Sequence, residues 1–328
     1  MQNPLKVVFL DSVHPVLMER LTEIGFLCLD YSKEPKEQAL ACLKDAFGIV
    51  IRSRFTLDKE LLSPLKNLKF IARSGSGLEN IDIAYCAEKG IELFNSPEGN
   101  RNAVAEHALG MLLSLMNKLN KADKEVKNGL WLREENRGEE LSGKCVGIIG
   151  YGNNGAAFAK VLRGFDVKVM AYDKYKTGFG SHFVQECTLQ ALMEQADIIS
   201  LHIPLNKDTV HLINTSFIEA LQKPIYLLNL SRGKIVSTKD LVAGMKNGKI
   251  KAAALDVLEY ETKSFEDFFE QNLPEEFAYL VAHQNILLSP HIGGWSIESY
   301  FKLSSVLAEK IVAWCNSDLI QDGDLIQA

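Results

Sequence analysis

The chain has 328 residues, of which 47% are hydrophobic, and its formal net charge at pH 7 is −6. This length and composition suit two packed domains, and the acidic balance argues against a nucleic-acid-binding protein, which would present a basic patch. No uninterrupted apolar run is long enough for a membrane-spanning helix, and the first residues lack the charge and apolar core of a signal peptide. We therefore expect a cytoplasmic protein that binds neither membranes nor nucleic acids.

The cysteines are scattered along the chain, without a C-x-x-C pair and without paired histidine spacing. This pattern is typical of reduced, mostly buried cysteines that behave as small apolar residues, so we expect no structural metal and no cysteine nucleophile. The six residues are Cys28, Cys42, Cys86, Cys145, Cys187 and Cys315.

Residues 1–100 alternate short β-rich runs with helical stretches, which predicts a parallel sheet with helices on both faces. The predicted strands are Val7–Leu10, Phe26–Leu29, Gly48–Ile51, Phe70–Ala72 and Ile91–Phe94. The predicted helices are Pro15–Ile24, Glu37–Lys44 and Ile83–Lys89. No glycine fingerprint follows the first strand, so this part is not expected to bind the nucleotide.

A long helix is predicted next, over Asn102–Leu119. It is followed by a polar stretch that contains Trp131 and ends at Leu141-Ser142-Gly143. We interpret this long helix and its polar arm as a connector and an oligomer contact.

The strongest motif is a glycine loop between a predicted strand, Lys144–Ile149, and a predicted helix, Ala156–Arg163. The loop reads Gly150-Tyr151-Gly152-Asn153-Asn154-Gly155. Its glycines would allow a tight turn, the approach of a pyrophosphate and close helix–strand packing, while the helix N-terminus favours the phosphates. A second strand, Val167–Tyr172, ends on Asp173, where an acid would accept hydrogen bonds from the adenosine ribose and repel a 2′-phosphate. The pattern predicts NAD binding.

Further predicted strands lead directly into charged or titratable residues. Tyr226–Asn229 precedes Arg232, Ala252–Val257 precedes Glu259 and Glu261, and Ile286–Leu288 precedes His291. Ligands of open parallel sheets bind outside the carboxyl ends of the strands, so we expect these side chains to converge there. Ile198–Leu201 is another strand of this sheet, and Ser296–Trp314 is a final helix.

In this order the motifs resemble those of the D-2-hydroxyacid dehydrogenase family, in its phosphoglycerate dehydrogenase-like group, along essentially the whole chain. The matching segments are Arg73–Asp82, Asn102–His107, Gly147–Gly155, Asn229–Gly233, Leu255–Val257 and Ser289–Gly294. The resemblance implies an α/β fold with two doubly wound parallel-sheet domains, a Rossmann NAD-binding domain inserted into a flavodoxin-like substrate domain. It places the substrate domain at residues 1–101 and 292–328 and the NAD-binding domain at residues 102–291. It also implies a homodimer built on the NAD-binding domains, including the arm near Trp131.

The resemblance also implies roles for individual residues. His291 matches the general acid/base, Glu261 matches the acid that pairs with it, and Arg232 matches the arginine that binds the substrate carboxylate and carbonyl. Asp256 matches a residue beside the nicotinamide carboxamide, although it could simply cap a strand end. Backbone amides around Ser74, Gly75, Ser76 and Gly77 would hold the substrate carboxylate. The cofactor-binding residues are expected to be Gly150, Gly152, Asn153, Asn154, Gly155, Asp173, Pro204, Thr209 and Asp256.

Several positions depart from the family pattern. Thr262 stands where a proline usually follows the catalytic glutamate, and the segment from Glu261 to His291 is longer than usual, with an aromatic and acidic run at Phe265–Phe277. Asn153-Asn154 replaces a commoner apolar pair in the glycine loop. Because these departures alter the loop that carries Glu261, Glu259 remains a rival to Glu261. Four other histidines are expected to be structural: His107, His202, His211 and His283.

The substrate is expected to be a small 2-hydroxy or 2-keto acid. Arg52, Arg54 and Arg73 lie at or near carboxyl ends of strands in the first domain, where they could meet a phosphate. This favours a D-3-phosphoglycerate-type substrate, with glyoxylate or hydroxypyruvate as the alternative. A different class also remains open, an NAD-sensing protein of the co-repressor type, in which cofactor binding governs assembly rather than turnover.

Overall fold

The computed structural model describes residues 4–261 and 274–319. These residues form two compact units. The described part of the first unit comprises residues 4–100 and 295–319, and that of the second comprises residues 101–261 and 274–294. The divisions expected from the sequence, at 101/102 and 291/292, lie close to these. Thr262 and most of the aromatic and acidic run after it lie outside the described residues.

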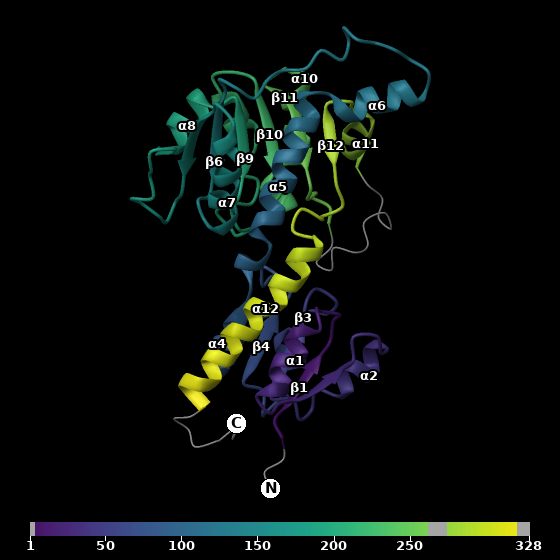
Figure 1. Ribbon diagram of the computed structural model, residues 1–328, viewed down its shortest axis with the longest axis vertical. Helices are drawn as coiled ribbons and strands as arrows, with labels where there is room; N and C mark the ends of the chain where they lie inside the picture. Colours follow the sequence, from purple (N-terminus) through teal and green to yellow (C-terminus); the bar gives the residue numbers. More distant parts are fainter. Residues whose placement is uncertain (1–3, 262–273, 320–328) are drawn as a thin grey trace. The chain divides into compact units, whose positions relative to one another are not determined.

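The first unit is built on a five-stranded sheet with the order β2-β1-β3-β4-β5, in which every pairing is parallel (Figure 1). The strands are β1 (Lys6–Phe9), β2 (Leu27–Asp30), β3 (Gly48–Ile51), β4 (Phe70–Arg73) and β5 (Glu92–Asn95). The helices are α1 (Val16–Glu23), α2 (Lys36–Ala41), α3 (Lys59–Leu62), α4 (Ile83–Lys89) and α12 (Ile297–Trp314). The order of strands reverses between β1 and β3, which makes the sheet doubly wound.

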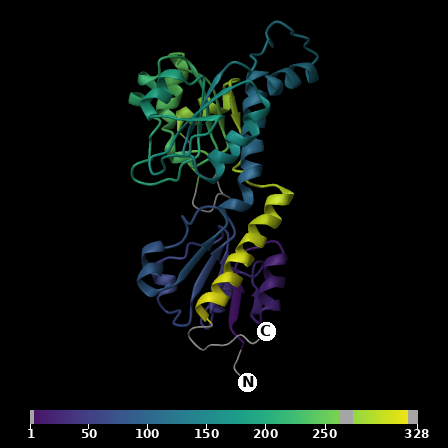
Figure 2. The same ribbon diagram turned by 60° about the vertical axis from the view of Figure 1, so that its left-hand side comes forward.

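Helices cover both faces of this sheet. On one face α1 and α12 pack on Val7, Phe9 and Phe70. Figure 1 and Figure 2 both show α12 lying along this sheet. On the other face α2, α3 and α4 contribute to the cluster that contains Ile49 and Ile71. Gly48 lies opposite Phe70 in the register, and a Cβ atom there would stand 2.2 Å from Phe70 Cζ. A larger residue at this position would displace the central ring.

The second unit is built on a seven-stranded parallel sheet with the order β12-β11-β10-β9-β6-β7-β8. Its strands are β6 (Cys145–Ile149), β7 (Lys168–Tyr172), β8 (Val184–Glu186), β9 (Ile198–Leu201), β10 (Ile225–Asn229), β11 (Ile250–Leu255) and β12 (Ile286–Leu288). Its helices are α5 (Pro97–Met116, belonging to this unit from Arg101), α6 (Leu119–Lys127), α7 (Asn153–Val161), α8 (Leu189–Gln195), α9 (Thr215–Ala220), α10 (Thr238–Lys246) and α11 (Glu275–Ala282).

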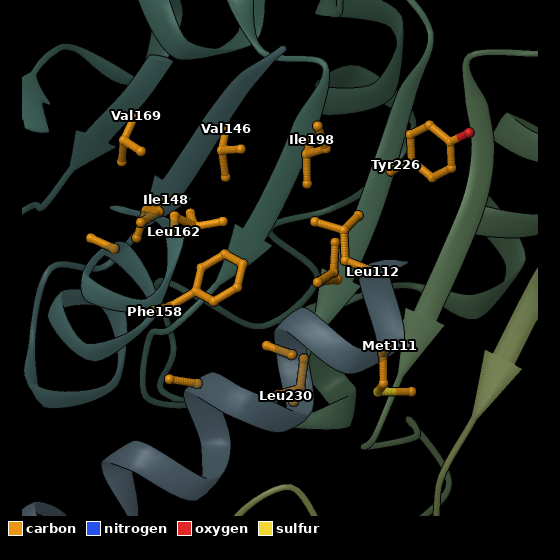
Figure 3. Packing of buried hydrophobic residues seen from close by; sticks show 14 of the residues in the cluster. Met111, Leu112, Val146, Ile148, Phe158, Leu162, Val169, Ile198, Tyr226 and Leu230 are labelled. Atoms are coloured by element: carbon orange, nitrogen blue, oxygen red, sulfur yellow. The ribbon is translucent and has the colours of Figure 1, made fainter. Parts of the chain in front are cut away.

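Two hydrophobic layers enclose the seven-stranded sheet. Figure 3 shows one of them, in which Leu112 of α5 and Phe158 of α7 pack on Val146, Ile198 and the strands beside them. The opposite layer joins α8, α9, α10 and α11 to the other face of the same strands. The strand order reverses between β6 and β9, so the glycine loop after β6 lies at the switch point of the sheet.

The largest difference from the sequence prediction concerns the long helix. It begins earlier than expected, at Pro97, because proline is well suited to a first helical turn. It ends at Met116, and Lys118 has a left-handed backbone (φ 53°) that separates α5 from α6. The three-residue strand β8 and the helices α3, α8, α9, α10 and α11 are not individually predicted. All of them have nine residues or fewer, and segments of this length carry little periodicity.

Within residues 4–261 and 274–319, no helix is both long and apolar enough to cross a membrane. The cytoplasmic location stays a prediction. All six cysteines are free thiols, and burial raises the pKa of the Cys86 and Cys187 thiols to about 11. These two side chains are therefore protonated at neutral pH.

Candidate active site

The glycine loop after β6 is open at one position and closely packed at the others. Gly150 has φ 94°, and a Cβ atom there would stand 2.4 Å from the His202 carbonyl oxygen. A Cβ on Gly155 would stand 2.0 Å from the Gly150 oxygen, whereas a Cβ on Gly152 would meet no atom within 4 Å. Gly152 precedes α7, whose N-terminus has no side-chain cap. Open space beside uncapped amide groups fits a pyrophosphate.

The two asparagines that follow Gly152 lie in the first turn of α7. Asn153 is exposed, while Asn154 is half-buried and its Oδ1 atom is buried without a hydrogen-bond partner among the described residues. Both residues are helical, so a helix follows the glycine loop although polar side chains replace the commoner apolar pair. Whether they contact the cofactor stays a prediction.

Asp173 lies at the end of β7, beside the glycine loop. Its Oδ2 atom accepts a hydrogen bond from the Tyr151 amide at 2.8 Å, and its Oδ1 atom accepts from the amides of Tyr175 and Lys176. The carboxylate is thus fixed next to the middle of the glycine loop, where the sequence predicts a ribose contact. In the loop after β9, Thr209 Oγ1 donates to the Pro204 carbonyl oxygen at 2.7 Å, so these two predicted cofactor residues touch each other.

Arg232 lies in a tight turn after β10. Asn229 holds this turn, because its Nδ2 donates to the Arg232 carbonyl oxygen at 2.9 Å and its Oδ1 accepts from the Ser231 amide at 3.1 Å. Gly233 is packed closely enough that a Cβ atom there would stand 1.9 Å from the Leu258 carbonyl oxygen. The arginine turn is therefore fitted directly against the loop that leads to Glu261.

His291 and Glu261 form a hydrogen-bonded pair. The distance from His291 Nδ1 to Glu261 Oε2 is 2.8 Å, and the two side chains are 26% and 15% exposed. The other oxygen of Glu261 accepts from the Leu258 amide, which fixes the carboxylate. Because an ionised carboxylate can only accept, the proton between them belongs to Nδ1, and Nε2 is then the basic nitrogen of the neutral ring.

Glu259, the rival to Glu261, contacts a different histidine. Its Oε1 lies 2.6 Å from His211 Nε2, and its Oε2 accepts from the Thr238 amide at 2.8 Å. Both oxygens of Glu259 thus have partners, one in the segment between β9 and α9 and one at the start of α10. The structure brings Glu261, and not Glu259, to His291.

Asp256 is 2% exposed and holds the turn that carries His291. Its carboxylate accepts from the amides of Ile292 (2.9 Å) and Gly293 (2.8 Å) and from Ser289 Oγ (2.6 Å). The His291 amide donates to the Asp256 carbonyl oxygen at 2.8 Å. These contacts define a structural role for Asp256, while its contact with the nicotinamide carboxamide stays a prediction.

In the first unit, the predicted carboxylate-binding loop follows β4. The amide of Ser74 donates to the Ile51 carbonyl oxygen, and that of Gly75 donates to the Arg73 carbonyl oxygen, both at 2.8 Å. Among the described residues, the amides of Ser76 and Gly77 have no such acceptor. Of the four backbone amides predicted to bind the substrate carboxylate, only those of Ser76 and Gly77 remain candidates.

Arg54 is committed to the backbone of its own unit. Its Nη1 donates to the carbonyl oxygens of Leu10 (3.2 Å), Tyr31 (3.0 Å) and Ser32 (2.8 Å), and its Nη2 donates to that of Glu34. These contacts join the loops after β1 and β2. The expectation that Arg54 meets a phosphate is therefore not supported by its surroundings, and the reason is this use as a structural donor.

The other two arginines differ from each other. Arg73 is 8% exposed, and its Nε donates to the Arg52 carbonyl oxygen at 3.1 Å. The guanidinium carbon of Arg52 lies 4.1 Å from the centre of the Trp295 ring, in a cation–π contact within the first unit. Trp295 is 48% exposed.

The sequence patterns do not single out Asn229, Ser289 or His202 as site residues. Each belongs to, or directly follows, the carboxyl end of a strand of the seven-stranded sheet, and that placement is the signal they carry. Burial lowers the pKa of His202 to about 4, so this ring is neutral beneath the glycine loop. No group of three or more His, Cys, Asp or Glu side chains suited to a metal ion occurs in the part of the chain that the structure describes.

A comparison with protein-family models identifies the family of the chain. Residues 109–293 match the model described as "D-isomer specific 2-hydroxyacid dehydrogenase, NAD binding domain". The chain belongs to the D-isomer specific 2-hydroxyacid dehydrogenase family. This confirms the resemblance, the α/β class with two parallel sheets and the NAD-binding domain predicted from the glycine loop.

Relatives within this dehydrogenase family carry several different names. The chain is 35% identical to a D-3-phosphoglycerate dehydrogenase of Archaeoglobus fulgidus, over 81% of this chain and 49% of that protein. It is 34% identical to a hydroxypyruvate reductase of Thermotoga maritima, over 84% of this chain and 87% of that protein. A crystal structure of D-lactate dehydrogenase from Aquifex aeolicus, complexed with NAD and lactic acid, matches with a TM-score of 0.80 and 28% identity, covering 98% of this chain and 99% of the other. The chain thus spans about half the length of the phosphoglycerate dehydrogenase that it matches.

Proposed function

We propose that the protein is an NAD-dependent D-2-hydroxyacid dehydrogenase, which transfers a hydride reversibly between C2 of the acid and the nicotinamide. The observation that carries the proposal is the His291–Glu261 pair at 2.8 Å, in the same unit as the glycine loop and the Arg232 turn. A protein that only senses NAD would have no use for a histidine oriented by a carboxylate. Family membership supports the same conclusion.

The residues of the glycine loop fit NAD. Open space at Gly152, an uncapped α7 N-terminus and the fixed Asp173 carboxylate supply room and donors for a pyrophosphate and an acceptor for ribose hydroxyls. When bound there, NAD supplies the nicotinamide ring that accepts or returns the hydride. Since the Asp173 carboxylate would repel a 2′-phosphate, we expect a preference for NAD over NADP.

His291 acts as the general acid/base in this proposal. In the direction of oxidation, its Nε2 takes the proton of the C2 hydroxyl while the C2–H bond gives up its hydride and C2–O becomes a carbonyl. Glu261 stabilises the imidazolium that forms, because its carboxylate lies against Nδ1. In the direction of reduction, the same nitrogen returns the proton to the oxygen of the substrate.

Arg232 binds the carboxylate of the substrate. Its guanidinium offers parallel N–H donors that match two carboxylate oxygens, and this fixes the orientation of C2. In the first unit, we propose the amides of Ser76 and Gly77 as donors to a carboxylate of the substrate. Both assignments keep the roles that were predicted from the sequence for these residues.

For the substrate class, we propose a short acid that carries a hydroxyl or a phosphate at C3, as in hydroxypyruvate or 3-phosphohydroxypyruvate. Arg52 is the remaining candidate for this distal group, since Arg54 is used by backbone carbonyls and Arg73 is buried. The cation–π contact with Trp295 holds the Arg52 guanidinium in a fixed orientation. Arg52→Met should raise KM for the preferred acid more than it lowers kcat, whereas unchanged kinetics would remove Arg52 from the substrate site.

The test of the proposed function is NADH consumption by the purified protein with a panel of 2-keto acids. The panel contains 3-phosphohydroxypyruvate, hydroxypyruvate, glyoxylate and pyruvate, and NADPH replaces NADH as the control. Strong preference for the phosphorylated acid would assign Arg52 to the phosphate, while preference for hydroxypyruvate would keep the mechanism without it. Tight NADH binding with no turnover of any acid would contradict the proposal and favour an NAD-sensing protein.

We also propose that the protein is a homodimer that uses its arm. The arm, defined as residues 119–140, carries apolar side chains that are unusual on a free surface. The exposed members are Leu119 (54%), Val126 (51%), Leu130 (49%), Trp131 (77%) and Leu132 (38%). Trp131→Glu should shift the protein from dimer to monomer in light scattering. A wild-type monomer, or an unaltered dimer in the variant, would contradict this assignment.

A further inference from the structure

The turn that carries His291 has a backbone conformation that other contacts must stabilise. His291 has φ 55°, a left-handed backbone that is sterically disfavoured for any residue with a Cβ atom. Four hydrogen bonds already described join this turn to the carboxylate and carbonyl of Asp256. The orientation of His291 thus depends on where the Asp256 carboxylate is held.

A histidine of α5 reaches the same carboxylate through a serine. His107 Nε2 lies 3.0 Å from Ser289 Oγ and 3.6 Å from Asp256 Oδ1, and all three residues belong to the second unit. Ser289 Oγ in turn lies 2.6 Å from Asp256 Oδ1. Its other neighbour, the Met111 sulfur at 3.7 Å, is a much weaker acceptor.

The hydrogen bonds that link His107, Ser289 and Asp256 can have only one set of donors and acceptors. The Asp256 carboxylate can only accept, so the single hydroxyl proton of Ser289 is donated to it. At 3.0 Å the His107 ring must then donate to the oxygen of Ser289, which requires a proton on Nε2. The sequence runs from His107 Nε2–H to Ser289 Oγ–H to the Asp256 carboxylate, and it stabilises a carboxylate that is 2% exposed.

We propose that His107 and Ser289 are positioning residues for His291, because their ordered hydrogen bonds hold the Asp256 carboxylate on which the His291 turn is built. The inference rests on the proposed role of His291 in turnover. It assigns a role to a histidine that the sequence indicates only as structural. Neither side chain is required to touch the substrate or the cofactor.

The experiment compares variants at His107 that differ in where they place a donor. Gln places its amide nitrogen where His has Nε2, Asn places it near Nδ1, and Leu removes it. Ser289→Ala removes the hydroxyl that links His107 to Asp256. His182→Leu, at an exposed position, is the matched control. The readouts are kcat with the best acid of the panel, the Kd of NADH, and amide hydrogen exchange of the peptide that covers residues 286–294.

His107→Leu, His107→Asn and Ser289→Ala should each lower kcat about tenfold, since small displacements of a catalytic group are costly, and should accelerate exchange at Ile292 and Gly293. His107→Gln should restore kcat to within about threefold of wild type, and the Kd of NADH should change less than about twofold in every variant. Equal kcat for Gln and Leu, or unchanged exchange in the Leu and Ala variants, would overturn the proposal. If the wild type turns over no acid, the dehydrogenase assignment fails, while the exchange data still decide whether this chain holds the turn.

Discussion

The two parallel sheets are built alike, but their carboxyl edges are used differently. At the edge of the five-stranded sheet, Arg54 donates to backbone carbonyls, and Asp11 Oδ2 accepts from the amides of Arg52, Ser53 and Arg54. These charges hold the unit's own loops together. At the edge of the seven-stranded sheet, the Gly152 position is open and the N-terminus of α7 has no side-chain cap.

The comparison shows that a shared architecture does not locate the chemistry. Both edges carry arginines and acids at comparable positions, so fold alone would not distinguish them. The backbone partners of the two arginines differ, because Arg54 donates to four carbonyl oxygens of separate loops, whereas Arg232 Nη1 donates to the carbonyl oxygen of the neighbouring Ser231 at 2.7 Å. We therefore assign hydride and proton transfer to the seven-stranded edge and loop stabilisation to Arg54 and Asp11.

Among the variants that test this difference between the two sheet edges, Arg232→Met should have the largest effect on activity. Loss of a charged, two-pronged contact with the substrate carboxylate should lower kcat/KM about 10³-fold, through both KM and kcat. The free energy of unfolding should change little, because the turn is held by Asn229. Steady-state kinetics together with urea unfolding would separate an effect on catalysis from an effect on stability. A loss of stability large enough to explain the loss of activity would contradict the substrate role of Arg232.

The two His–Glu pairs provide the next test. Glu261→Gln should lower kcat about 10²-fold, because a neutral amide does not stabilise the imidazolium that forms on His291. Glu259→Gln, at the matched pair with His211, should leave kcat within about threefold of wild type. If the Glu259 variant lost more activity than the Glu261 variant, the assignment of the two acids would be reversed.

Arg54→Met should act on stability instead of chemistry. Removing a guanidinium that donates to carbonyl oxygens after β1 and β2 should lower the free energy of unfolding by about 2 kcal/mol. Urea denaturation measures this, with Arg163→Met as control, since Arg163 is exposed and lies outside the arm. A stable variant that had lost its affinity for the 2-keto acid would instead return Arg54 to the substrate site.

The smallest expected effect is a dependence of stability on pH. Burial lowers the pKa of His202 from 6.5 to about 4, so below pH 6.5 the unfolded chain binds a proton that the folded chain does not. Stability from this group is present above pH 6.5 and falls as the pH falls, by about 1 kcal/mol between pH 6.5 and pH 5.5. His202→Gln should remove that part of the slope in urea titrations at several pH values. An unchanged slope would contradict the buried, neutral state of this ring.

Much of this molecule could be predicted from its sequence, because long periodic segments and the glycine loop have local causes. The strand at Gly48–Ile51 and the helix at Ile83–Lys89 are examples in which structure and prediction agree. The break of the long helix at Lys118 could not be predicted, since an αL lysine has no strong sequence signal.

The candidate site divides in the same way. The resemblance to the family implied Glu261 as the partner of His291, and the structure brings these two side chains together. The commitment of Arg54 to carbonyl oxygens and the chain from His107 to Asp256 depend on contacts between residues far apart in the sequence. Such contacts are set by tertiary packing, which periodicity does not encode.

The most direct test of the central claim is the rate of hydride transfer in His291→Ala, measured by stopped-flow NADH oxidation with the best 2-keto acid beside the wild type. General acid/base catalysis contributes about 10²–10⁴-fold, so the account predicts a loss of that size with the Kd of NADH nearly unchanged. A variant that transfers hydride at close to the wild-type rate would contradict the claim that the seven-stranded edge supplies the proton through His291.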